Sequence, residues 1–171
     1  MTDADLIGVE VVRGEVITDW IDINGHMNVA NYLQAFDEAV VRLRQDFGVT
    51  EDYVCNGHST FAVECHMTYQ RELTLGDPYV ITAQLLAYNS TSLHQFNRMY
   101  HADEHFLAAT AESMTLHVNL ERRRVIPWPA EILANISTFT DGQRDLPYPV
   151  EAGRQIRIRN AIFSTEPEHH D

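Results

Sequence analysis

The feature that most constrains this chain is a single amphipathic helix among segments that otherwise favour strands. Between residues 29 and 47, apolar side chains recur at steps of three and four, which predicts a helix with one apolar stripe. The stripe consists of Val29, Tyr32, Leu33, Phe36, Val40, Leu43 and Phe47. Asn28 or Asn31 can cap its start, and Gly48 stands where a helix C′ residue is expected. A lone helix must bury such a stripe against a large apolar surface.

Strand patterns lie on both sides of this helix. Residues 9–21 are rich in β-branched side chains and favour a strand with a bulge or bend at Gly14. Further strand patterns, separated by turn residues, follow at 59–69, 79–88, 93–100 and 106–120. This order predicts an α+β fold in which a curved antiparallel sheet wraps around one long central helix.

The pattern at 59–69 assigns side chains to two faces of a strand, because alternate residues share a face. The face expected to cover the helix carries Phe61, Val63, Cys65, Met67 and Tyr69. The opposite face carries Thr60, Ala62, Glu64, His66 and Thr68. Two interpretations of Glu64 and His66 remain open: a pair on a solvated sheet face, or part of a binding site.

The C-terminal part of the chain is less regular. Residues 130–139 favour a short helix, and we expect one domain over 1–140 with an extension over 141–171. Within the extension, 155–163 fits either an added edge strand or a tail that docks on the domain or on a partner subunit. Residues 166–171 are expected to fray.

Composition narrows the class of function. The formal net charge of −13 disfavours binding to nucleic acid or to an anionic membrane. No apolar run approaches the length of a membrane span, and the N-terminus lacks the pattern of a signal peptide. Cys55 and Cys65 form neither a CxxC motif nor a disulfide framework. These features favour a cytoplasmic protein with reduced thiols.

The stretch DINGHMN, residues 22–28, runs directly into the helix. In an extended loop, Asp22, Asn24 and His26 would point the same way, close to the positive end of the helix dipole. Helix amides there can stabilise an oxyanion, while a carboxylate attacks a thioester carbonyl or activates a water. His26 can orient that carboxylate or act as the base itself, and Gly25 allows close approach of a ligand. The alternative is that these residues only form a turn and a helix cap.

This stretch resembles the loop of the hotdog-fold thioesterases, the 4-hydroxybenzoyl-CoA thioesterase-like superfamily. That loop carries an Asp, then Gly-His-Met/Val-Asn, before a helical Tyr; here these are Asp22, residues 25–28 and Tyr32. The spacing of Asp22, Asn24 and His26 is also similar to the catalytic row of plant acyl-carrier-protein thioesterases. The resemblance covers about residues 10 to 135. It implies a hotdog domain over 1–140 that hydrolyses acyl thioesters.

Within that superfamily, the chain is most similar to the thioesterases of bacterial carnitine breakdown, which act on betainyl-CoA. The shared stretches are WIDINGHMN, FAVECHMTY and ATAESMTLHVN. The resemblance implies that Glu64 or a nearby aromatic ring holds a quaternary ammonium group. Hotdog proteins similar to this chain dimerise through the sheet and have active sites between subunits, which implies a homodimer or a dimer of dimers. Glu64 and His66 could complete a site begun by Asp22 and His26 of either subunit.

The resulting hypothesis is hydrolysis of a small acyl-CoA by Asp22, Asn24 and His26. Gly25, Asn28 and Tyr32 would contact the substrate, and helix amides near residues 28–31 would hold the carbonyl oxygen. Arg122 and Arg123 would contact coenzyme A phosphates, unless the run 122–124 is merely a solvated turn.

No metal or redox cofactor is implied, because this reaction needs positioning, a base and an oxyanion site. Coenzyme A is part of the substrate. Two rivals remain: an acyl-thioester hydratase or dehydratase using a helix carboxylate, Asp37 or Glu38, and a module that binds acyl-CoA without turnover.

Overall fold

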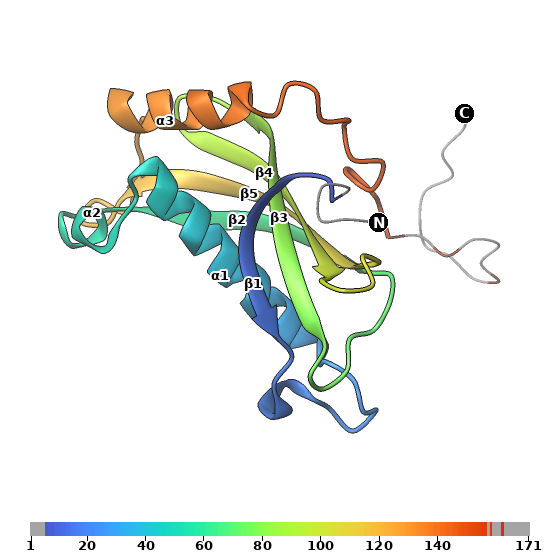
Figure 1. Cartoon of the computed structure of the whole chain (residues 1–171). Coiled ribbons are helices and arrows are strands. Elements are labelled where there is room, and N and C mark those ends of the chain that lie inside the picture. The colour runs from blue at the N-terminus through green and yellow to red at the C-terminus, as the bar shows by residue number, and fades with distance from the viewer. Residues whose placement is uncertain (1–5, 157, 159–161, 163–171) are drawn as a thin grey trace.

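A curved antiparallel sheet wraps around one long helix (Figure 1). The computed structural model describes residues 6–156, 158 and 162. The sheet order is β1-β3-β4-β5-β2, and every pairing is antiparallel. The main strands are β1 (Val9–Glu15), β2 (His58–Tyr69), β3 (Pro78–Tyr88), β4 (Ser92–His101) and β5 (Leu107–Asn119). A short strand, β6 (Arg124–Val125), pairs with β5. The predicted fold class is confirmed.

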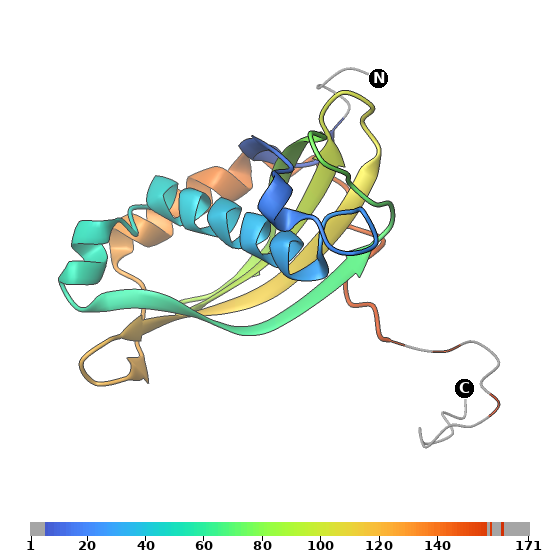
Figure 2. The same ribbon diagram turned by 90° about the horizontal axis from the view of Figure 1, so that it is seen from below.

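Helix α1 (Val29–Phe47) lies on the concave side of this sheet (Figure 2). Asn28 caps it by accepting a hydrogen bond from the amide of Ala30 at 3.0 Å, and Gly48 ends it in the left-handed conformation. Most of the predicted stripe is buried, but Val29 and Leu33 are 58% and 48% exposed. The prediction that these two residues are buried was wrong. Each of them lines a cavity that also includes residues of the edge strand β2.

Two local features at the start of the chain differ from expectation. Strand β1 ends at Glu15, and a 3-10 helix, η2 (Thr18–Trp20), takes up the rest of the predicted 9–21 strand. The β1 irregularity lies between Glu10 and Val12, not at Gly14. A Cβ atom at Gly14 would collide with the ring of Tyr79, which explains this glycine.

Two further helices follow α1 in the described part of the chain. Helix α2 (Glu51–Cys55) was not expected from the sequence. Helix α3 (Ala130–Asp141) confirms the predicted C-terminal helix and packs Ile132 and Ile136 against the end of α1. None of the described helices is long and apolar enough to cross a membrane.

A bulge in β2 changes which side chains face the helix. The register with β5 shifts between Ala62 and Glu64: Ala62 pairs with Thr115 and Glu64 with the next residue, Met114, so Val63 is the extra residue. Ala62 therefore lines a cavity beneath α1 together with Cys65, although the two differ by an odd number of positions. The predicted faces of Phe61 and Ala62 were wrong, since strict alternation cannot anticipate an inserted residue.

The segment after α3 returns to the sheet. Gln143 accepts a hydrogen bond from the amide of Leu85 at 2.9 Å and donates one to the carbonyl of Ala83 at 3.1 Å. Farther along, the amide of Gly153 donates to Glu112 Oε2 at 2.7 Å on the outer face. The chain thus crosses the outer face as far as Gly153. The expected behaviour of 155–163 and 166–171 falls largely outside the described residues.

Buried His117 links β5 to α2 and to the segment before α3. Its Nδ1 donates to the carbonyls of Ile126 and Pro127, at 3.0 and 3.1 Å, and its Nε2 accepts from the Tyr53 hydroxyl at 2.7 Å. The ring stacks on Trp128 with centroids 4.4 Å apart. This pattern suits the neutral imidazole, and burial lowers the pKa of His117.

Because the folded protein favours neutral His117, its free energy of unfolding should depend on pH. In the unfolded chain this imidazole takes up a proton below pH about 6.5, whereas the folded protein resists it until lower pH. We therefore expect the free energy of unfolding to fall as pH drops from 7 to 5. Urea denaturation across this range should give a shallower pH slope for His117→Gln than for the wild type. Equal slopes would contradict this role.

Candidate active site

Residues 21–28 fold into a tight turn between η2 and α1. Ile21 and Met27 form an isolated β-bridge, and the amide of Asp22 donates to the carbonyl of His26 at 3.0 Å. The amide of Gly25 donates to the carbonyl of Asp22 at 3.0 Å, and Gly25 has a φ of +81°, which favours glycine. The predicted extended row was therefore wrong. The turn, rather than alternation, brings the ends of this stretch together.

The three predicted catalytic side chains meet in this turn. Asp22 Oδ1 accepts a hydrogen bond from the amide of Asn24 at 2.8 Å and lies 3.8 Å from His26 Nδ1. The Asn24 side-chain amide lies 3.4 Å from Asp22 Oδ2. The side chains of Asp22 and His26 are 17% and 31% exposed, so both are partly shielded from water. His26 Nδ1 donates a hydrogen bond to the carbonyl of Met27 at 3.3 Å, so its contact with Asp22 is at ion-pair distance and is not a hydrogen bond.

A cavity of about 220 Å³ lies beside the turn. Its wall combines His26 and Met27 from the turn, Val29 and Tyr32 from α1, and Tyr69 from the end of β2, continuing along residues 70–72. His26 thus stands between Asp22 and this cavity. The cavity gives a ligand access to the His26 side chain, which in turn lies beside Asp22.

Tyr32 and Tyr69 form an edge-to-face pair in this wall, with centroids 5.4 Å apart. The Tyr32 hydroxyl oxygen accepts a hydrogen bond from the amide of Leu73 at 3.0 Å, and the Tyr69 hydroxyl donates to the carbonyl of Val29 at 3.4 Å. Burial raises the pKa of Tyr32, so its hydroxyl stays neutral. These contacts hold the outer wall of the cavity against the start of the helix.

The first turn of α1 offers fewer free amides than expected. The amides of Ala30 and Asn31 donate to the side chain and carbonyl of Asn28, and the amide of Asn28 donates to the carbonyl of Trp20. Of the amides at residues 28–31, only that of Val29 lacks an acceptor among the described residues. Val29 also lines the cavity. Its amide is the donor best placed for a carbonyl oxygen bound there.

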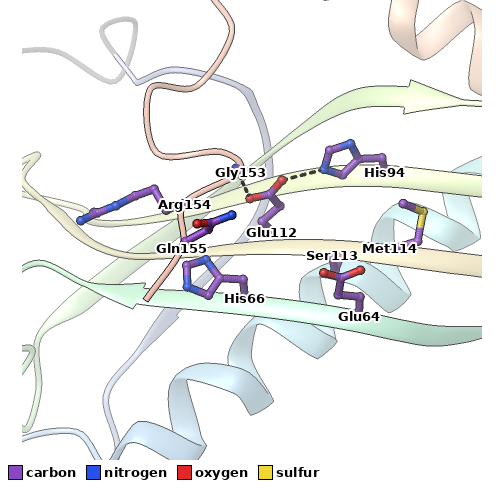
Figure 3. Close-up of a pocket in the computed structure, with 9 residues that line it drawn as sticks. All are labelled: Glu64, His66, His94, Glu112, Ser113, Met114, Gly153, Arg154 and Gln155. Atoms are coloured by element: carbon purple, nitrogen blue, oxygen red, sulfur yellow. Dashed lines mark hydrogen bonds and ion pairs between the residues drawn. The ribbon is translucent and has the colours of Figure 1, made fainter. Parts of the chain in front are cut away.

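Glu64 and His66 are not brought to this turn within one chain. They line a separate pocket of about 360 Å³ on the face of the sheet opposite α1 (Figure 3). In that pocket Glu112 pairs with His94 Nε2 at 2.8 Å and accepts from the amide of Gly153. The sheet itself separates this pocket from the turn. Their assignment to the substrate site stays a prediction.

Arg122 and Arg123 lie in the turn after β5, at the end of the sheet where His58 pairs with Asn119. The guanidinium of Arg123 lies 5.1 Å from the centre of the Phe61 ring. The candidate turn lies at the other end of α1, whose 19 residues span about 28 Å. One chain therefore does not bring these arginines to Asp22. Within the described residues, no group of three or more His, Cys, Asp or Glu side chains is arranged to hold a metal.

Sequence reasoning missed two parts of this site. Tyr69 was expected only to cover the helix, because nothing in the strand pattern indicates contact with a residue 40 positions away. The single free amide of Val29 was also not foreseen. The sequence did carry a signal for it. Asn28 is a recognisable N-cap, and a cap pairs some of the first amides of a helix and leaves fewer of them free for a ligand.

Known proteins share this architecture. A structure from Staphylococcus aureus, described as a protein in complex with CoA, matches with a TM-score of 0.84 and 29% identity, covering 90% of this chain and 98% of that one. A putative thioesterase from Pseudomonas putida matches with a TM-score of 0.79 and 26% identity, covering 90% of this chain and 99% of that chain. The hotdog fold predicted from the sequence is thereby confirmed.

Sequence relatives give the same family. A betainyl-CoA thioesterase of Pseudomonas aeruginosa is 33% identical over 144 residues, covering 84% of this chain and 91% of that protein. A protein of Rhizobium meliloti named L-carnitine dehydrogenase/betainyl-CoA thioesterase is 36% identical over 148 residues, covering 86% of this chain but only 30% of that protein. The chain spans about a third of the length of such two-function relatives.

The family model described as the thioesterase-like superfamily matches residues 16–136, a range that contains the Asp22–His26 turn, α1 and β2–β5. Fold, turn and relatives agree, and the chain belongs to the thioesterase-like superfamily.

Proposed function

We propose that this protein hydrolyses a small acyl-CoA thioester to a free acid and coenzyme A. The observation that carries the proposal is the Asp22–His26 pair, 3.8 Å apart, beside a cavity at the start of α1. A carboxylate, an imidazole and a free helix amide are the groups that thioester hydrolysis requires.

In the proposed reaction, the thioester carbonyl oxygen accepts a hydrogen bond from the Val29 amide. Water attacks the carbonyl carbon, and the Asp22–His26 pair takes the proton that this water loses. The C–S bond then breaks, and the leaving sulfur receives a proton to give free coenzyme A. Asn24 holds the carboxylate through its backbone amide, at 2.8 Å. In the alternative route, Asp22 attacks directly and forms a mixed anhydride that water then hydrolyses.

Betainyl-CoA is the first substrate to test, because several relatives carry that name. Another short acyl-CoA is the alternative. Glu64, proposed from the sequence to hold the quaternary ammonium group, lies across the sheet from the turn. If it takes part, it does so through a second subunit. A cytoplasmic location also stays a prediction.

A homodimer, or a dimer of dimers, accounts for the surface beside the cavity. Strand β2 is an edge of the sheet. Two apolar side chains near this edge, Val63 on β2 and Leu33 on α1, are about half exposed. An unpaired edge of 12 residues with apolar neighbours favours pairing with another copy. Antiparallel pairing of two β2 strands would bring Arg122 and Arg123 of one copy toward the turn of the other.

The catalytic roles are tested by measuring thiol release from short acyl-CoAs. We expect Asp22→Asn and His26→Gln each to lower kcat/KM by about 100-fold or more, because each removes part of the base. Asp19→Asn, a nearby exposed acid in η2, should stay within about twofold of the wild type. Wild-type rates in both site variants would refute the mechanism. Hydration of an enoyl-CoA, with no thiol release, would support the rival hydratase instead.

The arginine turn gives a second prediction. Arg122→Gln with Arg123→Gln should raise KM for acyl-CoA several-fold at low salt and leave kcat nearly unchanged, because phosphate contacts contribute binding rather than chemistry. Arg144→Gln, which removes an exposed arginine on the segment after α3, is the matched control.

The proposed dimer is tested by light scattering, which should give a mass of at least twice that of one chain. A monomer that retains full activity would contradict the shared site.

A further inference from the structure

The interior beneath α1 is interrupted by a band of polar side chains. One apolar cluster includes Ala39 of α1 and Met99 of β4, and a second includes Leu43 of α1 and Leu93 of β4. Between the two clusters lie buried or half-buried polar residues from three elements: Arg44 of α1, Gln95 and Asn97 of β4, and Ser113 and Thr115 of β5. A core that only had to be stable would fill these positions with apolar side chains.

Several atoms of this polar band have no hydrogen-bond partner among the described residues. They are Arg44 Nε, Asn97 Nδ2 and Ser113 Oγ, and each is shielded from solvent. Asn97 is only 1% exposed. Some bonds are made, because Arg44 Nη2 donates to Thr115 Oγ1 at 3.2 Å and Gln95 Nε2 lies 3.4 Å from Asn97 Oδ1. Buried donors left unpaired destabilise the fold, so their presence requires a reason.

A cavity of about 80 Å³ leads to these atoms from the β2 edge. Leu33 and Cys65, both exposed, stand at its outer side, and Phe36, Val40 and Ala111 provide apolar walls. Arg44, Asn97 and Ser113 line the same cavity, and Asp37 also borders it. Burial lowers the pKa of Arg44 to about 10, so its guanidinium stays charged at neutral pH. The cavity therefore presents several hydrogen-bond donors, and the carboxylate of Asp37 offsets the charge of Arg44.

We propose that this cavity binds the acyl group of the substrate, and that the distal end of that group carries an acceptor oxygen. A hydroxyl, keto or carboxylate oxygen would pair with Asn97 Nδ2, Arg44 Nε and Ser113 Oγ. The inference rests on the proposed thioester hydrolysis and defines its substrate class. A trimethylammonium group has no acceptor atom for these donors, so the betainyl group would leave them unpaired.

The sheet register limits the length of the acyl group. Tyr69, in the wall of the cavity beside the turn, pairs with Ala109, and Asn97 pairs with Ala111 two residues farther along β5. Tyr69 and Asn97 lie on opposite sides of β5, so their Cα atoms are separated by about 7 Å along the strand and by two strand spacings, about 10 Å, across the sheet, which gives roughly 12 Å in all. The side chains of Tyr69 and Asn97 fill part of this distance. The matching substrates are therefore acyl-CoAs of medium chain length with a terminal oxygen, such as 6-hydroxyhexanoyl-CoA or adipyl-CoA.

Binding is tested with thioether analogues, which cannot be hydrolysed. Calorimetry compares S-hexyl-CoA with S-(6-hydroxyhexyl)-CoA, which differ by one hydroxyl group. We expect the wild type to bind the hydroxylated analogue about tenfold more tightly. Asn97→Leu and Ser113→Ala should each bring this ratio toward one. The Asn97→Leu variant should melt within a few degrees of the wild type, because it removes the unpaired Nδ2 donor and loses only the long bond from Gln95.

Thr110→Val is the matched control, since Thr110 is equally buried on β5 but bonds to Thr68 Oγ1 on the outer face. It should leave the ratio unchanged. Equal affinity of the wild type for the two analogues, binding of neither, or an unchanged ratio in both Asn97→Leu and Ser113→Ala would overturn the inference. Hydrolysis of acyl-CoAs without the preference refutes this inference alone. The preference without any thiol release refutes the proposed hydrolysis alone.

Discussion

Burial of one helix face in a curved sheet is the constraint on which the rest of this structure depends. The five stripe residues that remain buried fix the rotation of α1, and its axis then fixes where its first turn meets the end of β2. The Asp22–His26 turn is anchored to that first turn by Asn28, whose amide bonds to Trp20. A site built in this way is as rigid as the core behind it, which is what positioned acid–base groups require.

The same packing leaves one side of the molecule incomplete. Strand β2 ends the sheet with an unpaired edge, and Leu33 and Cys65 stay exposed beside it. The cavity beside the turn and the smaller cavity beneath α1 both lie along this side. A second copy paired here would shield both cavities from water, which strengthens electrostatic interactions inside them. The roles proposed for the distant arginines and for Glu64 and His66 require such an assembly.

The polar band beneath α1 places unpaired hydrogen-bond donors in the core of the fold. Natural cores tolerate an unpaired donor rarely, and here several converge on one cavity. The relatives named for betainyl-CoA share the fold and the family, but a substrate name does not follow from either. The unpaired donors of Arg44, Asn97 and Ser113 favour an acyl group that carries an acceptor oxygen.

The sequence by itself determined the architecture: the period of α1, the strand patterns and the DINGHMN stretch predicted the fold and brought Asp22, Asn24 and His26 into one candidate site. These signals are local, since each depends on residues within one element. The tertiary structure decided what depends on distant partners. It showed the tight turn, the β2 bulge that exchanges Phe61 and Ala62, the Tyr69–Val29 contact and the cavity at Asn97. Register, pairing and cavities arise between elements far apart in the chain, so no local pattern contains them.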